Sequence, residues 1–193
     1  RPLFQVGALL EASAAHGGRN AYNHLRCLAL SNGIGRARVE EVLDQVGLRS
    51  AARRRTGGFS LGMTQRLGIA AALLGDPPVL MFDEPVNGLD PDGVLWIRTL
   101  VKALVAEGRT VLLASHLMSE MAITADRLII IGRGRLIAQS TIRDFLEGVR
   151  AASLSYFGHE PETLTAGEQA MLIALPQSPE ARRPDRRPDA ARV

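Results

Sequence analysis

The sequence predicts an α/β fold built around a parallel sheet, and three observations support this prediction. Apolar runs at 79–82 and 110–114 do not alternate with polar residues, which predicts strands that are buried on both faces. Segments with helical periodicity alternate with these runs along the chain, as is typical of layered α/β cores. Two adjacent acids, Asp83 and Glu84, follow the first run, at the edge where open parallel sheets bind their ligands.

The composition of the chain excludes several protein classes. With 193 residues, 46% apolar and 22% charged, the chain is typical of a globular protein with one core, or with a core and a small lobe. No apolar run reaches the roughly 18 to 20 residues that cross a bilayer. The single Cys27 forms no internal disulfide and no secretory pattern opens the sequence, so we expect a cytoplasmic location. Much of the net charge of +3 lies in the Arg-rich segment 176–193, so we expect no nucleic-acid partner.

Three amphipathic helices are predicted before the first strand, at 20–30, 36–46 and 60–74. The second has apolar residues at i, i+3, i+4 and i+7, and Gly47 stops it. The third begins at Ser60, a residue type that caps helix N-termini, and ends before a glycine and the sequence DPP.

Alternating elements are also predicted after the first strand. The pair Asp90-Pro91 caps a long helix, which the second buried strand at 110–114 follows. A helical piece through 118–121 comes next. Strands at 128–131 and 135–138 then flank a Gly-Arg-Gly turn, which predicts a hairpin.

The sequence VLMFDEP at 79–85 carries the strongest chemical signal, because a buried strand delivers two carboxylates to the edge of the sheet. One acid, Asp83, can hold Mg²⁺ directly or through water. Its neighbour, Glu84, can orient the water that attacks a phosphoryl group. A bland alternative is that such a pair only ends a strand, and the dipeptide alone favours this alternative.

Four motifs in one order carry a resemblance to the ABC transporter ATP-binding subunits. FDEP at 82–85 resembles the Walker B motif with its catalytic Glu, and GLD at 88–90 resembles the D-loop. His116 resembles the switch histidine. FSLGM at 59–63, followed by Gln65-Arg66, is similar to the ABC signature, in the form found in ABC-2 type bacterial exporters of the bacitracin, lantibiotic and multidrug kind.

The resemblance implies a partial P-loop NTPase (RecA-like) core with a parallel sheet, together with the ABC helical subdomain. Residues 1–75 are then expected to hold the Q-loop and the helical subdomain with the signature. Residues 76–150 are expected to hold the core part with Walker B, D-loop and switch His. The pattern fades after about residue 150, so 151–193 is predicted to be a divergent, disordered tail.

The resemblance also implies that ATP and Mg²⁺ are the cofactors. Glu84 is then expected to act as general base, Asp83 to serve the Mg²⁺, and His116 to sense the γ-phosphate. An ABC-type ATP hydrolase is therefore expected for the whole protein.

A second ATP-binding subunit is the first partner that the resemblance implies. Ser60 opens a helix whose N-terminal N–H groups and positive dipole end attract phosphate. Together with Gly62 it is expected to contact the γ-phosphate held by the opposite subunit of a head-to-tail dimer. Asp90 is expected to help couple the two nucleotide sites.

The sequence departs from the family pattern at two places. Leu61 and Met63 replace the first Gly and the Gln of the commonest signature, which we interpret as a feature of the exporter subgroup. Glu11 stands where the Q-loop Gln is expected, four residues after Gly7; a carboxylate can still ligate Mg²⁺ but adds negative charge near the phosphates. A solvated loop position is an equal alternative for Glu11.

No G-x-x-x-x-G-K-[ST] sequence occurs in the chain, and Lys102, its only Lys, has no glycine loop around it. The chain therefore resembles an N-terminally truncated subunit that lacks Walker A. Because that loop supplies most of the electrostatic clamp on the phosphates, we expect little or no ATPase activity from these residues alone.

The second expected partner is an integral membrane permease subunit, which would hold the protein at the inner face of the cell membrane. Two alternatives stay open: a soluble ABC ATPase that works on ribosomes or DNA, and a noncatalytic fragment that keeps the fold in part. The transported substrate and the direction of transport lie beyond this sequence.

Overall fold

The computed structural model describes residues 2–11, 15–115, 123–132, 134–158 and 160. The chain divides into two compact units, Arg1–Met118 and Ser119–Val193, and each is described by itself. The first unit has helices packed on a parallel sheet, which confirms the predicted α/β class. No helix in the described ranges is long and apolar enough to cross a membrane.

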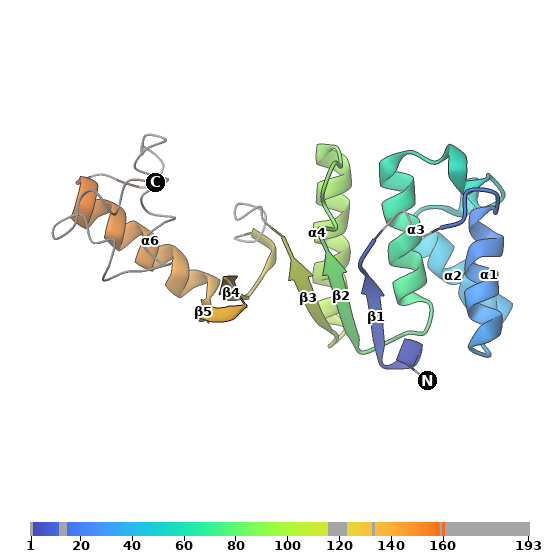
Figure 1. The fold of residues 1–193 in the computed structure, drawn as a ribbon, viewed down its shortest axis with the longest axis horizontal. Helices are drawn as coiled ribbons and strands as arrows, with labels where there is room; N and C mark the ends of the chain where they lie inside the picture. Colours follow the sequence, from blue (N-terminus) through green and yellow to red (C-terminus); the bar gives the residue numbers. More distant parts are fainter. Residues whose placement is uncertain (1, 12–14, 116–122, 133, 159, 161–193) are drawn as a thin grey trace. The chain divides into compact units, whose positions relative to one another are not determined.

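Three parallel strands form the sheet of the first unit, in the order β1-β2-β3 (Figure 1). They are β1 (Val6–Leu9), β2 (Val79–Asp83) and β3 (Thr110–Ala114). The register pairs Leu9 with Phe82 and Phe82 with Leu113, so the carboxyl ends of all three strands lie at one edge. The strands predicted at 79–82 and 110–114 are therefore confirmed.

The helices of the first unit are α1 (Ala21–Ser31), α2 (Arg36–Gln45), α3 (Leu61–Leu73) and α4 (Pro91–Ala106). Their bounds agree with the predicted helices. Asn20, Ser60 and Asp90 each accept a hydrogen bond from a backbone N–H three residues later, as N-cap residues do. Short 3-10 turns cover Pro2–Phe4, Arg49–Ala51 and Thr56–Gly58.

Among the described residues of the first unit, helices cover one face of the sheet, whereas the prediction was that the strands are buried on both faces. Leu80 and Phe82 of β2 are 0% and 2% exposed, and they join α3 and α4 in one hydrophobic core. The alternate residue Met81 is 38% exposed, and its neighbour Leu112 on β3 is 48% exposed. A continuous apolar run therefore does not by itself predict burial on both faces. In this unit the helices pack on the face of the sheet that carries Leu80.

Two glycines allow backbone segments of the first unit to approach closely. A Cβ atom added to Gly7 on β1 would overlap the backbone carbonyl of Ala72 on α3. A Cβ added to Gly75 would overlap the backbone carbonyl of Leu3 in the same way. Only glycine fits where a strand and a helix lie this close.

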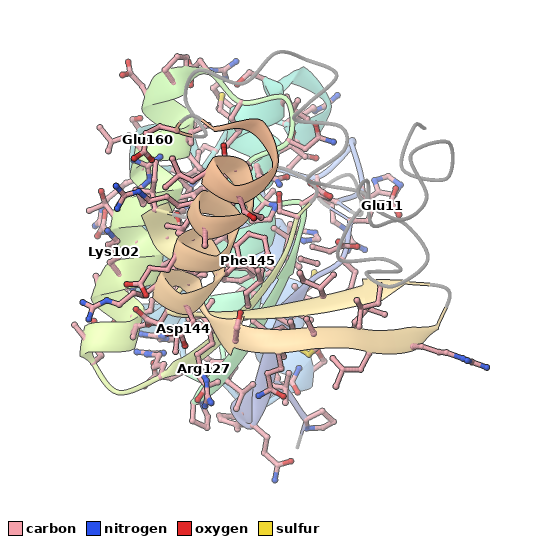
Figure 2. All side chains as sticks on the ribbon, turned by 90° about the vertical axis from the view of Figure 1, so that its left-hand side faces the viewer. Glu11, Lys102, Arg127, Asp144, Phe145 and Glu160 are labelled. Carbon is pink, nitrogen blue, oxygen red and sulfur yellow. The ribbon has the colours of Figure 1, made fainter. Side chains whose placement is uncertain are left out.

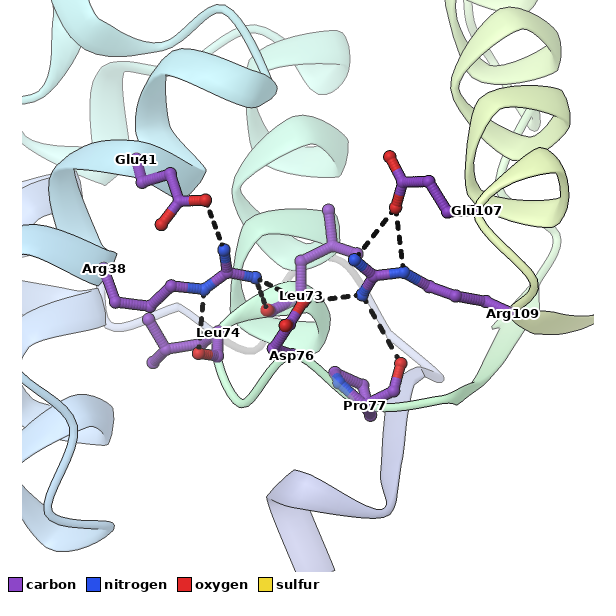
Figure 3. A network of polar contacts seen from close by, with 8 residues as sticks. All are labelled: Arg38, Glu41, Leu73, Leu74, Asp76, Pro77, Glu107 and Arg109. Carbon is purple, nitrogen blue, oxygen red and sulfur yellow. Dashed lines mark hydrogen bonds and ion pairs between the residues drawn. The ribbon is translucent and has the colours of Figure 1, made fainter.

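A polar network ties the C-terminal end of α3 to α2 and to the start of β3 (Figure 3). Arg38 on α2 donates to the carbonyl of Leu73 at 2.8 Å and pairs with Asp76 at 3.1 Å. Asp76 also pairs with Arg109 at 2.8 Å, and it adopts a positive φ of 53°. Terminal helix carbonyls need such donors, so Arg38 acts as a C-terminal cap for α3.

Arg66 connects three helices of the first unit. Its guanidinium stacks on the ring of Trp96 on α4 at 3.9 Å from the centroid. It also donates to the carbonyl of Val46, directly after α2, at 2.9 Å. The pKa of Arg66 is lowered, mainly because the side chain is partly buried. The negative charge of Asp90 acts in the opposite direction and raises this pKa. The side chain stays charged, so it holds α2, α3 and α4 together.

The second unit contains a hairpin and one helix. The strands β4 (Arg127–Gly132) and β5 (Arg135–Thr141) pair antiparallel, which confirms the predicted hairpin. Thr141 caps α6 (Ile142–Phe157), which continues past residue 150, where the tail is predicted to begin. The whole helical piece predicted at 118–121 lies outside the described residues, as do residues 159 and 161–193 of the predicted tail.

Candidate functional site

Asp83 and Glu84 lie at the carboxyl edge of the sheet. Asp83 ends β2 opposite Ala114, and it is exposed. The backbone N–H of Glu84 donates to the carbonyl of Ala114 at 2.9 Å, so the chain leaves β2 while still bonded to β3. Glu84 adopts a φ of 46°, in the left-handed region that non-glycine residues rarely occupy. Such a conformation at a ligand-binding edge is common in functional sites.

Strand β1 brings one further predicted site residue, Glu11, to the same edge. Glu11 follows β1 by two residues and is exposed (Figure 2). Because Leu9 pairs with Phe82, Glu11 leaves the sheet at the same edge as Asp83. His116 lies outside the described residues. Lys102, the only Lys of the chain, projects from the exposed side of α4 (Figure 2).

The signature segment forms the N-terminal end of α3. The Ser60 hydroxyl accepts a hydrogen bond from the Met63 N–H at 3.3 Å, as predicted for a cap. Ser60 is exposed and Gly62 is partly buried. The helix therefore presents its N-terminal N–H groups and dipole at the surface of the unit, where an anion is electrostatically favoured.

The signature segment contacts the D-loop segment within the same chain. A Cβ on Gly88, which has a φ of 69°, would lie 2.5 Å from Leu61 Cδ2. A Cβ on Gly62 would lie 3.6 Å from Leu89 Cδ2. Asp90 accepts a hydrogen bond from the Gly93 N–H at 2.8 Å and so starts α4. The structure thus brings the signature residues Leu61 and Gly62 next to the D-loop residues Gly88 and Leu89.

Gln65, which the sequence analysis names only as part of the signature resemblance, contacts the segment after β2 in a way that was not predicted. Its side chain is 5% exposed, and its Nε2 donates to the carbonyls of Glu84 at 3.2 Å and Pro85 at 2.9 Å. A usable signal existed in the sequence. Gln65 is a polar residue four positions before Ile69, on a helix that is otherwise apolar at nearly every turn.

The residues at the sheet edge fit part of a Mg²⁺–nucleotide site. Mg²⁺ in such sites uses one or two carboxylates, with phosphates and water as its other ligands, and Asp83 offers one exposed carboxylate. Within the described ranges, no three His, Cys, Asp or Glu side chains gather as a metal cluster. The phosphates would have to complete the coordination, so the edge fits a metal carried by its nucleotide.

Comparison with known proteins places this edge in a family context. Residues 9–87 match the family model described as ABC transporter. The chain is 40% identical over 141 residues to the uncharacterized ABC transporter ATP-binding protein YhcH of Bacillus subtilis (strain 168). It is 38% identical over 142 residues to the bacitracin transport ATP-binding protein BcrA of Enterococcus faecalis. Over these aligned residues the chain is similar to ABC transporter ATP-binding proteins.

The alignments cover different shares of this chain and of its relatives. Each of the two alignments takes in 72% of this chain and 46% of the relative. The lantibiotic transport ATP-binding protein SrtF of Streptococcus pyogenes is 34% identical over 139 residues, which is 61% of that protein. The chain therefore spans about half to three fifths of the length of the curated relatives it matches.

Solved structures of the family share the fold of this chain. A component of the ABC transporter complex cbiONQ from Clostridium perfringens superposes with a TM-score of 0.66 at 25% identity, covering 79% of this chain and 64% of that one. A dimeric ATP-binding cassette in a post-hydrolysis state, bound to ADP and Pi, gives a TM-score of 0.65 at 23% identity and covers 73% and 64%. The predicted P-loop NTPase type of core is confirmed.

A second family model, described as transglycosylase, matches residues 137–193. This match does not overlap the ABC transporter match at 9–87. It begins within β5 and includes α6, and the rest of it lies mostly outside the described residues.

Proposed function

We propose that the chain is part of an ATP-hydrolysing subunit of an ABC exporter, which drives a separate membrane permease subunit. The observation that supports this most directly is the edge of the sheet. There β2 delivers Asp83 and Glu84, and the end of β3 is bonded to Glu84 N–H. Relatives named for bacitracin and lantibiotic transport support the export role.

In this proposal the two carboxylates have separate tasks. Asp83 would hold Mg²⁺ directly or through water, and the chemistry that the metal would supply is neutralisation of negative charge on the phosphoryl group. Glu84 accepts a proton from the attacking water. Its left-handed backbone and its bond to Ala114 hold it in one geometry. Glu11 and His116 are proposed to act from the ends of β1 and β3.

A second ATP-binding subunit is proposed to complete the site. The exposed N-terminal end of α3, with Ser60 and Gly62, would meet the γ-phosphate held by the opposite subunit. Asp90, which caps α4 beside this segment, would help couple the two sites. The proposed location is the inner face of the cell membrane, through contact with the permease.

The 193 residues contain no G-x-x-x-x-G-K-[ST] sequence, so we propose little or no ATPase activity for them alone. Steady-state turnover of the purified chain tests this. Turnover above background that disappears in Glu84→Gln would contradict the proposal.

The proposed function is tested on the complete reading frame that contains these residues. Loss of a general base slows such reactions by about 10²- to 10⁴-fold, so Glu84→Gln is expected to abolish MgATP hydrolysis while nucleotide binding persists. Glu40→Gln, an exposed position on α2, serves as the matched control. Equal hydrolysis by the Glu84→Gln protein and the wild type would overturn the assignment. Affinity capture that recovers ribosomes, and no membrane protein, would overturn the transport role.

A second candidate function, glycosyl transfer, is favoured by the transglycosylase match at 137–193. The match begins inside β5, although β5 pairs with β4 along its length. We propose that the boundary between the two families lies after this hairpin, at the start of α6. Glycosyl transfer from a saccharide donor is compared between the full chain and residues 1–141. We expect glycosyl-transfer product from the full chain alone. If both proteins form the product, or if neither does, the glycosyl-transfer function is contradicted.

A further inference from the structure

We propose that Gln65 is a positioning residue for Glu84, and that Gln65 and Leu61 on α3 together clamp the loop 84–89. This inference rests on the proposed function, because the clamp matters for catalysis only if Glu84 acts on a bound nucleotide. The two residues are four positions apart, so they share one face of the helix.

The first half of the clamp is the buried amide of Gln65. A glutamine amide has two donor hydrogens, and here Nε2 donates to two consecutive carbonyls, those of Glu84 and Pro85. The side chain is 5% exposed, so water cannot readily replace these bonds. A buried carbonyl that loses its donor is costly, and α3 and the loop are therefore held together.

The second half of the clamp is the contact of Leu61 with Gly88. Leu61 Cδ2 occupies the space where a side chain at residue 88 would begin. Gly88 has a φ of 69°, and the Leu89 N–H donates to the carbonyl of Val86 at 3.2 Å. One face of α3 therefore contacts the loop 84–89 near both of its ends, through Gln65 at Glu84 and through Leu61 at Gly88.

The conformation of Glu84 explains why the loop needs a clamp. A φ of 46° is unfavourable for glutamate and persists only where the surroundings fix it. On one side, the Glu84 N–H bonds to β3 through Ala114. On the other side, its carbonyl accepts from Gln65, so the residue is held between the sheet and α3.

The clamp links two parts of the proposed site. Because α3 begins beside Ser60, a shift of the helix at its N-terminal end displaces Gln65 one turn further along. Gln65 then displaces the Glu84 carbonyl. A phosphate bound at the start of α3 would in this way change the position of Glu84 without any contact to it.

The first experiment measures amide hydrogen exchange by NMR on the ligand-free 193-residue chain. Gln65→Met keeps the length of the side chain but removes both donors. We expect the Glu84 and Asn87 amides to exchange about tenfold faster, while α2 amides change by less than about twofold. Gln45→Met on α2 is the matched control. Unchanged exchange at Glu84, or an equal increase at all amides, would overturn the clamp.

The second experiment separates positioning from a purely structural role. Ser60→Ala removes the cap of α3, and we expect it to shift the Glu84 amide resonance in the wild type. In the Gln65→Met background the same change is expected to have no further effect on Glu84. Additive shifts would overturn the coupling.

Leu61→Ala is the second variant, and it keeps the proposal testable if Gln65→Met does not fold. Leu61 is 53% exposed, so the variant is expected to fold. Faster exchange of the Leu89 amide, whose hydrogen bond to Val86 lies beside the contact, supports the clamp. If the Leu89 amide of Leu61→Ala exchanges at the wild-type rate, the contact between Leu61 and the loop is not part of a clamp, and the proposal is contradicted. All of these measurements use no nucleotide, so failure of the ATPase proposal in the Glu84→Gln assay is distinguished from failure of the clamp.

Discussion

Replacing Arg38 by Met tests whether the polar network at the end of α3 stabilises the fold through helix capping or through ion pairs. Arg38 donates to the carbonyls of Leu73 at 2.8 Å and Leu74 at 3.4 Å. It also pairs with Glu41 at 2.7 Å and Asp76 at 3.1 Å. Met keeps the apolar stem but removes every donor.

The magnitude follows from exposure. The Arg38 side chain is 19% exposed, whereas its partners Glu41 and Asp76 are 64% and 61% exposed. Exposed ion pairs contribute about 0 to 1 kcal/mol each. A charged donor to a buried carbonyl contributes about 1.5 to 3 kcal/mol, and the long bond to Leu74 adds little. We therefore expect a loss of about 2 to 3 kcal/mol, carried mainly by the bond to Leu73.

Urea unfolding followed by circular dichroism measures this loss. Arg49→Met is the control, because Arg49 is 62% exposed and forms its ion pair with the half-exposed Asp44. We expect at most about 1 kcal/mol for the control. Asp76→Asn is expected to cost no more than the control. If Arg38→Met lost no more than Arg49→Met, or if Asp76→Asn lost as much as Arg38→Met, the capping explanation would be wrong.

Three further predictions concern other parts of the first unit. Gly7→Ala is expected to destabilise the chain by about 3 kcal/mol or more in thermal unfolding, because the added Cβ overlaps a backbone carbonyl of α3. The control Gly58→Ala places its Cβ in open space and is expected to cost under about 1 kcal/mol. Burial, and secondarily the charge of Arg19, lower the pKa of His24, so the unfolded chain binds more protons as the pH falls through about 6.5. The free energy of unfolding should therefore decrease toward acid, and less steeply in His24→Gln; equal slopes would contradict this. Arg66→Met is expected to lower the free energy of unfolding in urea by about 1 to 3 kcal/mol, because it removes the stacking on Trp96 and the hydrogen bond to Val46. An unchanged free energy of unfolding would contradict this role of Arg66.

Local patterns predicted most of the first unit correctly. The helix starts at Asn20, Ser60 and Asp90 follow from cap residues, whose chemistry depends on neighbours within one turn. The strand that ends in Asp83 follows from its unbroken apolar run. These features require no knowledge of distant residues, so the sequence suffices for them.

Contacts between distant segments were beyond the sequence patterns. The one-sided burial of β2 depends on which face the helices choose, which Met81 itself does not reveal. The two hydrogen bonds from Gln65 join residues about twenty positions apart along the chain. The left-handed conformation of Glu84 has no sequence signal either, because glutamate rarely adopts it. The predicted roles of Ser60 and Asp83 stay predictions.

Within the described residues of the first unit, the face of the sheet opposite Leu80 exposes apolar side chains, and this has a consequence for how the chain behaves in solution. Val6, Met81 and Leu112 present apolar groups to solvent at 40%, 38% and 48% exposure on adjacent strands. Salting-out anions such as sulfate strengthen attraction between such surfaces, while low concentrations of urea weaken it. Precipitation by ammonium sulfate should therefore begin early in the titration, and an aspartate at residue 112 should delay its onset.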